Sequence, residues 1–278
     1  MPSPRRYHGP YLALKTHHLM VPYTQQPRRV RVLLPVNYEE NTTKTYPVVY
    51  MHDGQNVIHS RESYSGYSWK VIPHLKFNPN LPELIIVAID NDGENRLDEY
   101  TPWPFPHLES TASRHLGGLG KKYGKWVVEE VKPFIDAHYR TKQAADQTFL
   151  AGSSLGGLIT AYMGAAYPDV FGVLGVFSLA SWVQEEAFLH YIQHQKINPT
   201  TKVYIQVGTK EGNETDESFM AGNMDQKYID SSLWYYQTLL KTGAAQEQLW
   251  LRILADETHY EKYWADHFGE FLEFGFSQ

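Results

Sequence analysis

Two adjacent serines stand between glycines in the stretch Gly152-Ser153-Ser154-Leu155-Gly156. The stretch fits the pattern G-x-S-x-G, in which the central serine, here Ser154, is held at a tight turn between a strand and a helix. The apolar "TFL" before it and "LITAYMGAAYP" after it supply that strand and helix. We therefore predict that Ser154 is a nucleophile and that Ser153 only packs or hydrogen-bonds locally. The backbone N–H of Leu155, at the start of the helix, would then stabilise an oxyanion.

A serine hydroxyl is a weak nucleophile unless a base takes its proton, and an acid must orient that base. In chains with this turn the order is serine, acid, histidine. Four of the thirteen histidines follow the serine, namely His190, His194, His259 and His267. The first two are spaced i, i+4 on a helical pattern and His267 lies among phenylalanines, so we interpret these three as surface or packing residues. His259 lies between the last strand and the last helix, where a general base belongs, and we predict that it is the base.

The acid is expected in the loop "GTKEGNETDES", which follows the apolar run "KVYIQV". Four acidic residues compete there, namely Glu211, Glu214, Asp216 and Glu217. Glu211 is nearest the end of the strand, where the sheet fixes a side chain best. The other three would be solvated surface charges.

Extended runs and helical patterns alternate along most of the chain. Central runs such as "LIIVAI" are apolar on both faces, which is typical of parallel strands covered by helices. The alternation predicts an α/β fold with a mostly parallel eight-stranded sheet, helices on both faces, and an antiparallel hairpin formed by the two early strands. The expected strands are 12–23, 28–35, 46–54, 83–90, 147–154, 173–180, 202–209 and 248–256, and the expected helices 124–139, 155–168, 231–243 and 261–274.

Composition limits the classes of protein to consider. The chain has 278 residues and is 42% hydrophobic, enough for one α/β domain with a sizeable core. A net charge of −6 argues against nucleic acid as a partner, and the absence of cysteine excludes disulfides and thiolate chemistry. The N-terminal residues carry no secretory signal, and no segment is apolar enough to span a membrane, so we expect a cytoplasmic protein.

The longest segment without a clear pattern covers residues 91–123. Long loops are usually functional or disordered, and this one contains aromatic residues and prolines that favour an ordered wall. We predict that it lines a substrate pocket with the side chains of Tyr100, Trp103, Phe105 and His107. The domain is therefore expected to span residues 1–278, with a substrate-wall insert at about 91–123.

Several longer motifs resemble one known family. They are "YPVVYMHDGQN", "IDNDGENRLDEYTPW", "YGKWVVEEVKPFIDAHYRT", "FLAGSSLGGLITAY", "VGTKEG" and "THYEKYW". The chain is similar to the putative-esterase family of α/β-hydrolases, which includes enterochelin esterase-like, feruloyl-esterase-like and S-formylglutathione-hydrolase-like proteins. The resemblance covers most of the chain and implies an α/β-hydrolase fold.

The resemblance also implies a catalytic triad. The nucleophile of the family falls on Ser154 and its base on His259. Its acid follows a G-x-x-[D/E] turn, here residues 208–211, which supports Glu211. Because Asp is commoner than Glu at that position, Asp216 stays open as an alternative.

The resemblance further suggests residues around the reacting carbonyl. The second oxyanion donor of the family comes from the loop "HDGQN", so the N–H of Gln55 or Gly54 would join that of Leu155. Asp53 of the same loop and Ser178, at the end of the strand beside the elbow, are expected to contribute to the substrate pocket.

The segment "DEYTPW" is similar to a family segment near the active site. Arg96 and Glu99 are expected to be structural partners there, with Arg96 also among the substrate-binding residues. Trp182 and Trp69 are expected nearby as further walls.

These observations predict a serine carboxylic-ester hydrolase that forms an acyl-enzyme, acts on short-chain or compact aromatic acyl esters, and needs no cofactor or metal. Alternatives are a siderophore trilactone esterase, an acyltransferase and a catalytically silent binding protein with the same fold. A trilactone loaded with iron is anionic, and its basic partners would come from Arg61, Arg96, Arg114, Lys121 and Lys122. The expected partner is a small-molecule ester, with no nucleic acid and no membrane, and a homodimer is one open arrangement.

Overall fold

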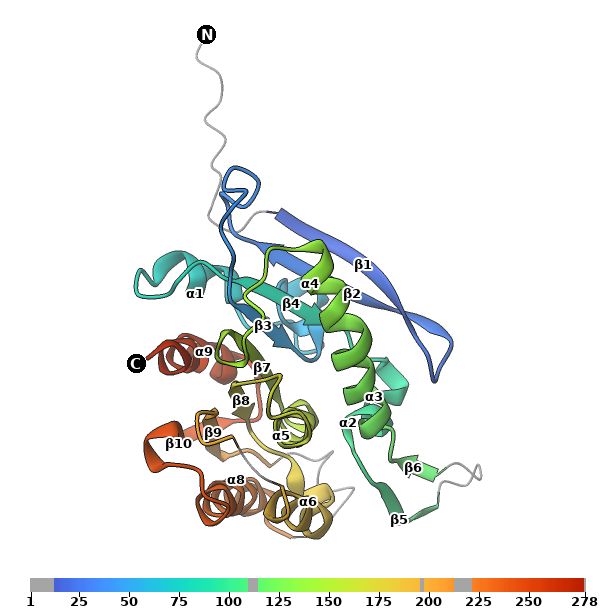
Figure 1. Ribbon diagram of the computed structural model, residues 1–278. Coiled ribbons are helices and arrows are strands. Elements are labelled where there is room, and N and C mark those ends of the chain that lie inside the picture. Colours follow the sequence, from blue (N-terminus) through green and yellow to red (C-terminus); the bar gives the residue numbers. More distant parts are fainter. Residues whose placement is uncertain (1–12, 110–114, 196–197, 213–221, 278) are drawn as a thin grey trace.

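An eight-stranded sheet runs through the centre of the molecule (Figure 1). The computed structural model describes residues 13–109, 115–195, 198–212 and 222–277. Across the sheet the strand order is β1-β2-β4-β3-β7-β8-β9-β10. The strands are β1 (Ala13–Val21), β2 (Gln26–Leu34), β3 (Val48–Met51), β4 (Ile85–Ile89), β7 (Thr148–Ser153), β8 (Val173–Phe177), β9 (Lys202–Lys210) and β10 (Leu249–Thr258).

The direction of the strands confirms the prediction of a mostly parallel sheet. Strand β2 pairs antiparallel with both β1 and β4. From β4 to β10 every neighbouring pair is parallel. The carboxyl ends of β7, β8, β9 and β10 therefore lie along one edge of the sheet, where α/β proteins place their ligand sites.

Helices cover both faces of the sheet. Successive residues of a strand point to opposite sides, so each central strand contributes side chains to two separate cores. Along β3, Val48 and Tyr50 enter one core and Val49 and Met51 the other. The first core is covered by α3 (Gly120–Trp126), the π-helical turn η4 (Val127–Val131), α4 (Lys132–His138), α5 (Leu155–Ala166), α6 (Glu185–Gln193) and α8 (Met224–Lys241), and the second by α1 (Val71–Phe77) and α9 (Glu261–Phe276). Among the helices of the described part, none is both long and apolar enough to cross a membrane.

The helix predicted for residues 124–139 contains a π-helical turn. Helices α3 and α4 run into each other through η4, where Lys132 N–H bonds the carbonyl of Val127. Pro133 follows at the start of α4 and has no N–H to give to the carbonyl four residues before it. The proline therefore accounts for a departure from the regular α pattern that the apolar periodicity alone did not reveal.

The segment 91–123 is not irregular throughout. It contains the turn η3 (Gly93–Asn95), the short helix α2 (Arg96–Tyr100) and an antiparallel pair, β5 (Pro104–Glu109) and β6 (His115–Gly117). The pair extends away from the main sheet beyond α2 (Figure 1). Hydrogen bonds to Thr101 hold the two ends of this pair together. The carbonyl oxygen of Thr101 accepts the N–H groups of Gly118 and Gly120, both at 3.0 Å.

Helix α2 is attached to the sheet by a buried ion pair. Glu99 has no exposed surface, and its two oxygens accept from Arg28 of β2 at 2.8 and 3.0 Å. The hydroxyl of Tyr23 donates to the same carboxylate at 2.7 Å. This differs from the expected pairing of Arg96 with Glu99: Arg96 instead binds Asp53, because the two side chains leave α2 in different directions.

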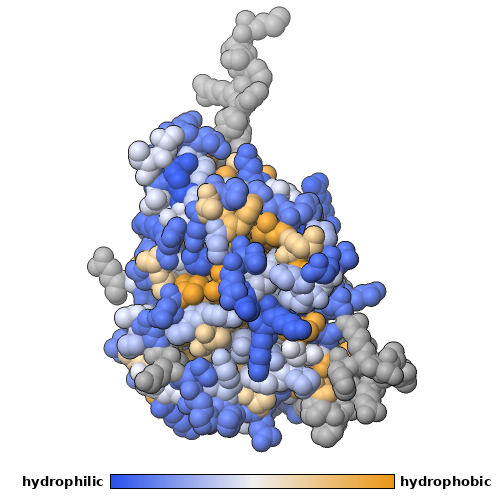
Figure 2. Space-filling model, turned by 45° about the vertical axis from the view of Figure 1, so that its right-hand side comes forward, coloured by the Kyte–Doolittle hydropathy of each residue, from blue (hydrophilic) through white to orange (hydrophobic). Residues whose placement is uncertain are grey.

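The surface is largely polar. The face seen in Figure 2 is mostly hydrophilic, with small apolar patches separated by charged and polar side chains. Large exposed apolar side chains such as Tyr64, Phe77 and Trp234 come from different parts of the fold. Scattered exposure of this kind is normal for a globular protein.

The buried pair predicts a large loss of stability for Glu99→Ala. That substitution removes the bidentate partner of the buried Arg28, which keeps only Asp92 and the carbonyl of Asp90, each at 3.3 Å, so it should lower the free energy of unfolding by up to about 3–5 kcal/mol. As a control, Glu129→Ala removes an exposed carboxylate 3.7 Å from Lys125 and should cost less than about 0.5 kcal/mol. Urea unfolding followed by circular dichroism measures both. Equal losses for the two variants would contradict the anchoring role.

Candidate active site

Ser154 occupies a strained turn between β7 and α5. Its backbone lies at φ 61° and ψ −126°, a region that residues with a side chain rarely adopt. The turn is held from the neighbouring strand, because Ser154 N–H bonds the carbonyl of Phe177 at 2.9 Å and its own carbonyl accepts from Ala180 at 3.3 Å. Gly152 is required here, since a Cβ at that position would lie 2.6 Å from the carbonyl oxygen of Gly156. This is the geometry expected of a nucleophile elbow.

Glu211 and His259 meet at the ends of the last two strands. Glu211 directly follows β9, His259 directly follows β10, and the parallel pairing of these strands brings the two residues together. The carboxylate oxygen Oε2 lies 2.7 Å from Nδ1 of the imidazole. The other oxygen, Oε1, accepts the N–H of Gly208 at 2.6 Å and the hydroxyl of Ser178 at 2.7 Å. An acid in this place fixes the tautomer and orientation of a histidine base.

Two aromatic rings flank the imidazole of His259. Tyr228 of α8 packs with its ring centroid 4.8 Å away, and Trp264 of α9 meets it edge-on at 5.1 Å. In the described part of the chain, neither Nε2 of His259 nor Oγ of Ser154 makes a hydrogen bond. Catalytic hydrogen bonds are often incomplete before substrate binds. Sequence analysis did not single out Tyr228 or Trp264, although Trp264 lies within the quoted motif "THYEKYW".

Backbone N–H groups are available beside the elbow. Asp53 adopts a left-handed conformation with φ 52°, and the turn η1 (Gly54–Asn56) follows it. The carbonyls of Asp53 and Gly54 accept the N–H groups of Asn56 and Val57. The N–H of Gln55 donates to no described group, and the same holds for the N–H of Leu155 at the start of α5. Free donors at these two helical starts suit a developing oxyanion.

The loop that carries Gln55 is fixed by a buried network around Asp53. Arg96 donates to both carboxylate oxygens at 2.7 Å, and Asn91 donates to one of them at 2.6 Å. Burial alone would raise the pKa of Asp53, but the charge and hydrogen bonds of Arg96 outweigh it and hold that pKa below its ordinary value. The N–H of Asp53 bonds the hydroxyl of the fully buried Tyr100 at 3.0 Å. Asp53 and Tyr100 thus lie inside the protein, while the side chain of Arg96 stays 27% exposed.

His52, which sequence analysis missed, precedes this loop. Its ring is buried between Tyr100 and Tyr123, with Nδ1 2.8 Å from the hydroxyl of Tyr123. Burial lowers the pKa of His52 to about 3, so the ring is neutral at physiological pH. Only its place in the motif "HDGQN", directly after a buried strand, could have drawn attention to it.

The other predicted residues lie at different depths. Trp103 is half-buried against Tyr162 and Tyr191, and Trp182 is buried against Tyr228. Ser178 is fully buried, beside Glu211. The alternative acid Asp216, together with Glu214, Glu217 and Arg114, lies outside the described residues, as does the side chain of His107. Phe105 is half-buried and Trp69 packs in the core.

The remaining histidines after the elbow take no part in this constellation. The rings of His190 in α6 and His194, directly after it, lie with their centroids 4.3 Å apart and are tilted by 35°. His267 lies between two carboxylates, those of Glu257 and Glu270. Within the described ranges, no group of three or more acidic or histidine side chains is arranged to hold a metal ion.

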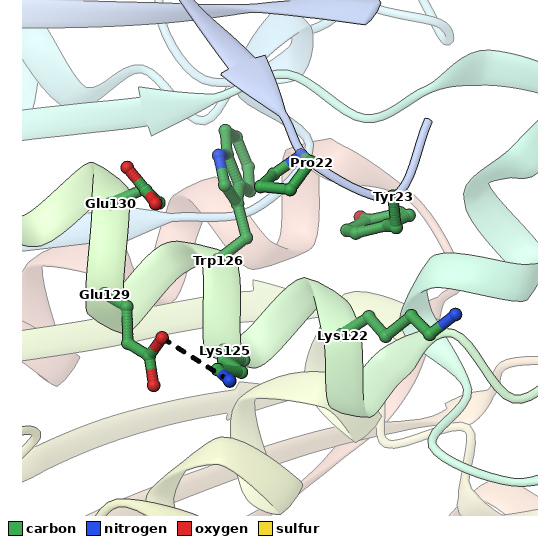
Figure 3. Close-up of a pocket in the computed structure, with 7 residues that line it drawn as sticks. All are labelled: Pro22, Tyr23, Lys122, Lys125, Trp126, Glu129 and Glu130. Carbon is green, nitrogen blue, oxygen red and sulfur yellow. Dashed lines mark ion pairs between the residues drawn. The ribbon is translucent and has the colours of Figure 1, made fainter. Parts of the chain in front are cut away.

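A separate hollow of about 420 Å³ lies between the β1–β2 turn and the α3–η4 helix (Figure 3). Pro22, Tyr23 and Trp126 line it together with lysines and glutamates, of which Lys125 and Glu129 form an ion pair. None of its lining residues belongs to the Ser154, Glu211 and His259 constellation or to the loop of Asp53. It is therefore not the place where these residues would act.

The parallel sheet, the strained serine turn and the residues that follow β9 and β10 define the chain as an α/β-hydrolase. A family model described as "Putative esterase" matches residues 22–272, so the chain belongs to that family, as the sequence motifs predicted. It is a carboxylesterase-type hydrolase.

The chain is also similar to a curated relative and shares its fold with solved structures. The chain is 28% identical over 246 residues to the "Uncharacterized protein YbbA" of Bacillus subtilis (strain 168), covering 88% of this chain and 91% of that one. Its fold is similar to that of an IroE-like serine hydrolase from Shewanella oneidensis, with a TM-score of 0.73, 18% identity, and 94% and 79% of the two chains covered. The enterobactin esterase FES from Shigella flexneri shares the fold with a TM-score of 0.69, 18% identity, and 94% and 58% of the chains covered.

Proposed function

We propose that this chain is a serine esterase that hydrolyses short-chain or compact aromatic acyl esters through an acyl-enzyme. The observation that carries the proposal is the 2.7 Å bond between the buried Glu211 and Nδ1 of His259, placed at the strand ends beside the elbow of Ser154. The acid and base are preorganised, and the serine lies at the start of a helix. Such a constellation is typical of acyl transfer.

The proposed reaction has two halves. Ser154 Oγ attacks the ester carbonyl carbon while Nε2 of His259 takes the hydroxyl proton, and Glu211 stabilises the imidazolium that forms. The tetrahedral intermediate then loses the alcohol, which receives the proton from His259, and an acyl ester on Ser154 remains. Water activated by the same histidine attacks this ester and releases the carboxylic acid. The residues present supply every group in this scheme, so it needs no cofactor.

The negative charge on the intermediate would be stabilised by two backbone N–H groups. Leu155 and Gln55 are the proposed donors, with Gly54 as the alternative on the same loop. The carboxylate of Asp53 lies close to the first turn of α5, since a Cβ at Gly156 would be only 3.2 Å from its oxygen Oδ2. A negative charge there would repel an oxyanion. The bidentate bond of Asp53 to Arg96 neutralises that charge.

A second candidate function is hydrolysis of a catecholate siderophore trilactone. The enterobactin esterase with the same fold favours it. An iron-loaded trilactone is strongly anionic and needs basic residues in the pocket. Two described arginines contact the candidate oxyanion loop, and the charges of both are already paired. Arg96 binds Asp53, and Arg31, which bonds the carbonyl of Gly54, is buried against Asp90 and Glu62. We therefore rank this function below hydrolysis of neutral esters.

The proposal predicts that Ser154→Ala abolishes hydrolysis of p-nitrophenyl acetate, with a loss in kcat on the order of 10⁴–10⁶. Ser153→Ala is the control and should keep a folded, active enzyme. Covalent labelling with a fluorophosphonate, located by peptide mass spectrometry, should mark Ser154. A folded Ser154→Ala protein with near-native turnover would contradict the serine mechanism, and labelling without turnover would indicate an acyltransferase or a silent binding protein.

For the acid, Glu211→Gln should be severely impaired, because the amide fills the same space but no longer stabilises an imidazolium. Asp216→Asn is the matched comparison and should be close to the native enzyme. Measured values of kcat/KM for the two variants decide between the candidates. The opposite ranking would move the acid to Asp216 and leave the nucleophile and base in place.

For specificity, we predict a higher kcat/KM for p-nitrophenyl acetate and butyrate than for esters with C12–C16 chains. The aromatic side chains of segment 91–123 suit flat or short groups, whereas long chains need an extended apolar tunnel. Trp103→Ala should change the ratio of kcat/KM between the short-chain and the C12–C16 esters. A native preference for long chains, or a ratio unaffected by Trp103→Ala, would refute the proposal that this segment forms the substrate wall.

A further inference from the structure

We infer that Ser178 and Trp264 form a positioning pair behind the triad, which holds Glu211 in the rotamer that orients His259. This inference rests on the proposed serine-esterase function. It gives Ser178 a different task from the one expected from the sequence, where it was a substrate-pocket residue. Its side chain has no exposed surface, so it acts through Glu211 and not on the substrate.

The chemistry of the three groups fixes the direction of their hydrogen bonds. Nε1 of Trp264 lies 2.7 Å from Oγ of Ser178, and that Oγ lies 2.7 Å from Oε1 of Glu211. An indole N–H can only donate, and an ionised carboxylate can only accept. The single hydroxyl proton of Ser178 must therefore point to Glu211.

This arrangement removes the rotational freedom of a glutamate. The terminal torsion of Glu is broad, so the carboxylate plane is poorly fixed unless donors hold it. Oε1 receives two donors, the N–H of Gly208 and the hydroxyl of Ser178, which leaves Oε2 directed at His259. Ser178 itself is held in a left-handed backbone conformation, with φ 45°. A residue that keeps such a conformation is fixed by its surroundings.

Trp264 completes a closed set of contacts. While its N–H holds Ser178, the edge of its ring packs against the imidazole of His259 with centroids 5.1 Å apart at 87°. The same indole therefore fixes the acid through Ser178 and the base by direct contact. Helix α9, which begins two residues after His259, places the indole in this position.

Removing the hydroxyl should affect chemistry and leave binding unchanged. In Ser178→Ala, Glu211 loses one charge-assisted hydrogen bond and its carboxylate is freer to turn, so it orients His259 and stabilises the imidazolium less well. We expect kcat to fall about 10- to 100-fold with KM nearly unchanged. The acid limb of the pH profile of kcat/KM should move to lower pH by about half a unit, because an imidazolium with a weakened carboxylate partner loses its proton more readily.

The experiment measures kcat and KM for p-nitrophenyl acetate from pH 5 to 9 in the native enzyme, Ser178→Ala, Trp264→Phe and the double variant. Trp264→Phe keeps a ring but removes the N–H, so it should reproduce the shift of the acid limb in weaker form. The double variant should be little worse than Ser178→Ala alone, because both residues act through one chain of bonds. Ser232→Ala is the matched control, since Ser232 is buried in α8 and its hydroxyl has no hydrogen-bond partner among the described residues.

Several results would overturn the inference. The first is a kcat for Ser178→Ala within about twofold of the Ser232→Ala value, and the second is a change confined to KM. The third is an acid limb that stays in place in both Ser178→Ala and Trp264→Phe. Should Ser178→Ala fail to fold, the acid limb of Trp264→Phe decides alone. Hydrolysis that survives Ser154→Ala would refute the esterase mechanism itself, whereas a Ser154-dependent activity insensitive to Ser178 would refute only the positioning role.

Discussion

Glu211 is a carboxylate with no exposed surface, and an isolated charge in that environment is strongly unfavourable. The structure around it supplies donors in place of water, from the backbone of Gly208, the hydroxyl of Ser178 and the imidazole of His259. These donors come from the ends of β8, β9 and β10, so they meet only if the three strands pair in parallel and in register. The buried carboxylate of Glu211 therefore finds its donors only when β8, β9 and β10 are neighbours, and the same arrangement orients the ring of His259.

Two further buried carboxylates follow the same logic and position the rest of the site. Asp53 is bound by Arg96 and Asn91, which fixes the loop of Gln55. Glu99 is bound by Arg28 of β2, which fixes α2, the helix that also carries Arg96. Because each carboxylate pairs with a different segment, the network connects β2, α2 and the loop after β3. Buried pairs of this kind specify one arrangement more clearly than they add stability.

The sequence was sufficient to predict the features that depend on local order. The G-x-S-x-G pattern identified the turn of Ser154. Chain order and nearness to a strand end favoured Glu211 and His259, with Asp216 left open as the acid, and the structure has Oε2 of Glu211 2.7 Å from Nδ1 of His259. The roles of Ser178 and Trp264 could not be predicted, since they arise from contacts between residues 86 positions apart. The partner of Glu99 was missed for the same reason: Arg28 is 71 residues away, and Arg96 was the nearer cation in the sequence. Periodicity likewise carried no information on the π-helical turn or on the pairing of β5 with β6.

Helix α5, which begins directly after Ser154, has almost no solvent-facing side. Its residues from Gly156 to Ala165 are all buried, so it lacks the amphipathic pattern of a surface helix. A helix of this kind is held by tertiary packing on every side and has little independent stability. It cannot tilt or fray to relieve the strained backbone of Ser154 while the rest of the domain stays intact. The strained backbone of Ser154 therefore persists only while the whole domain is folded. If Ser154 is the proposed nucleophile, the rate at which it is covalently labelled would measure the folded fraction of a sample.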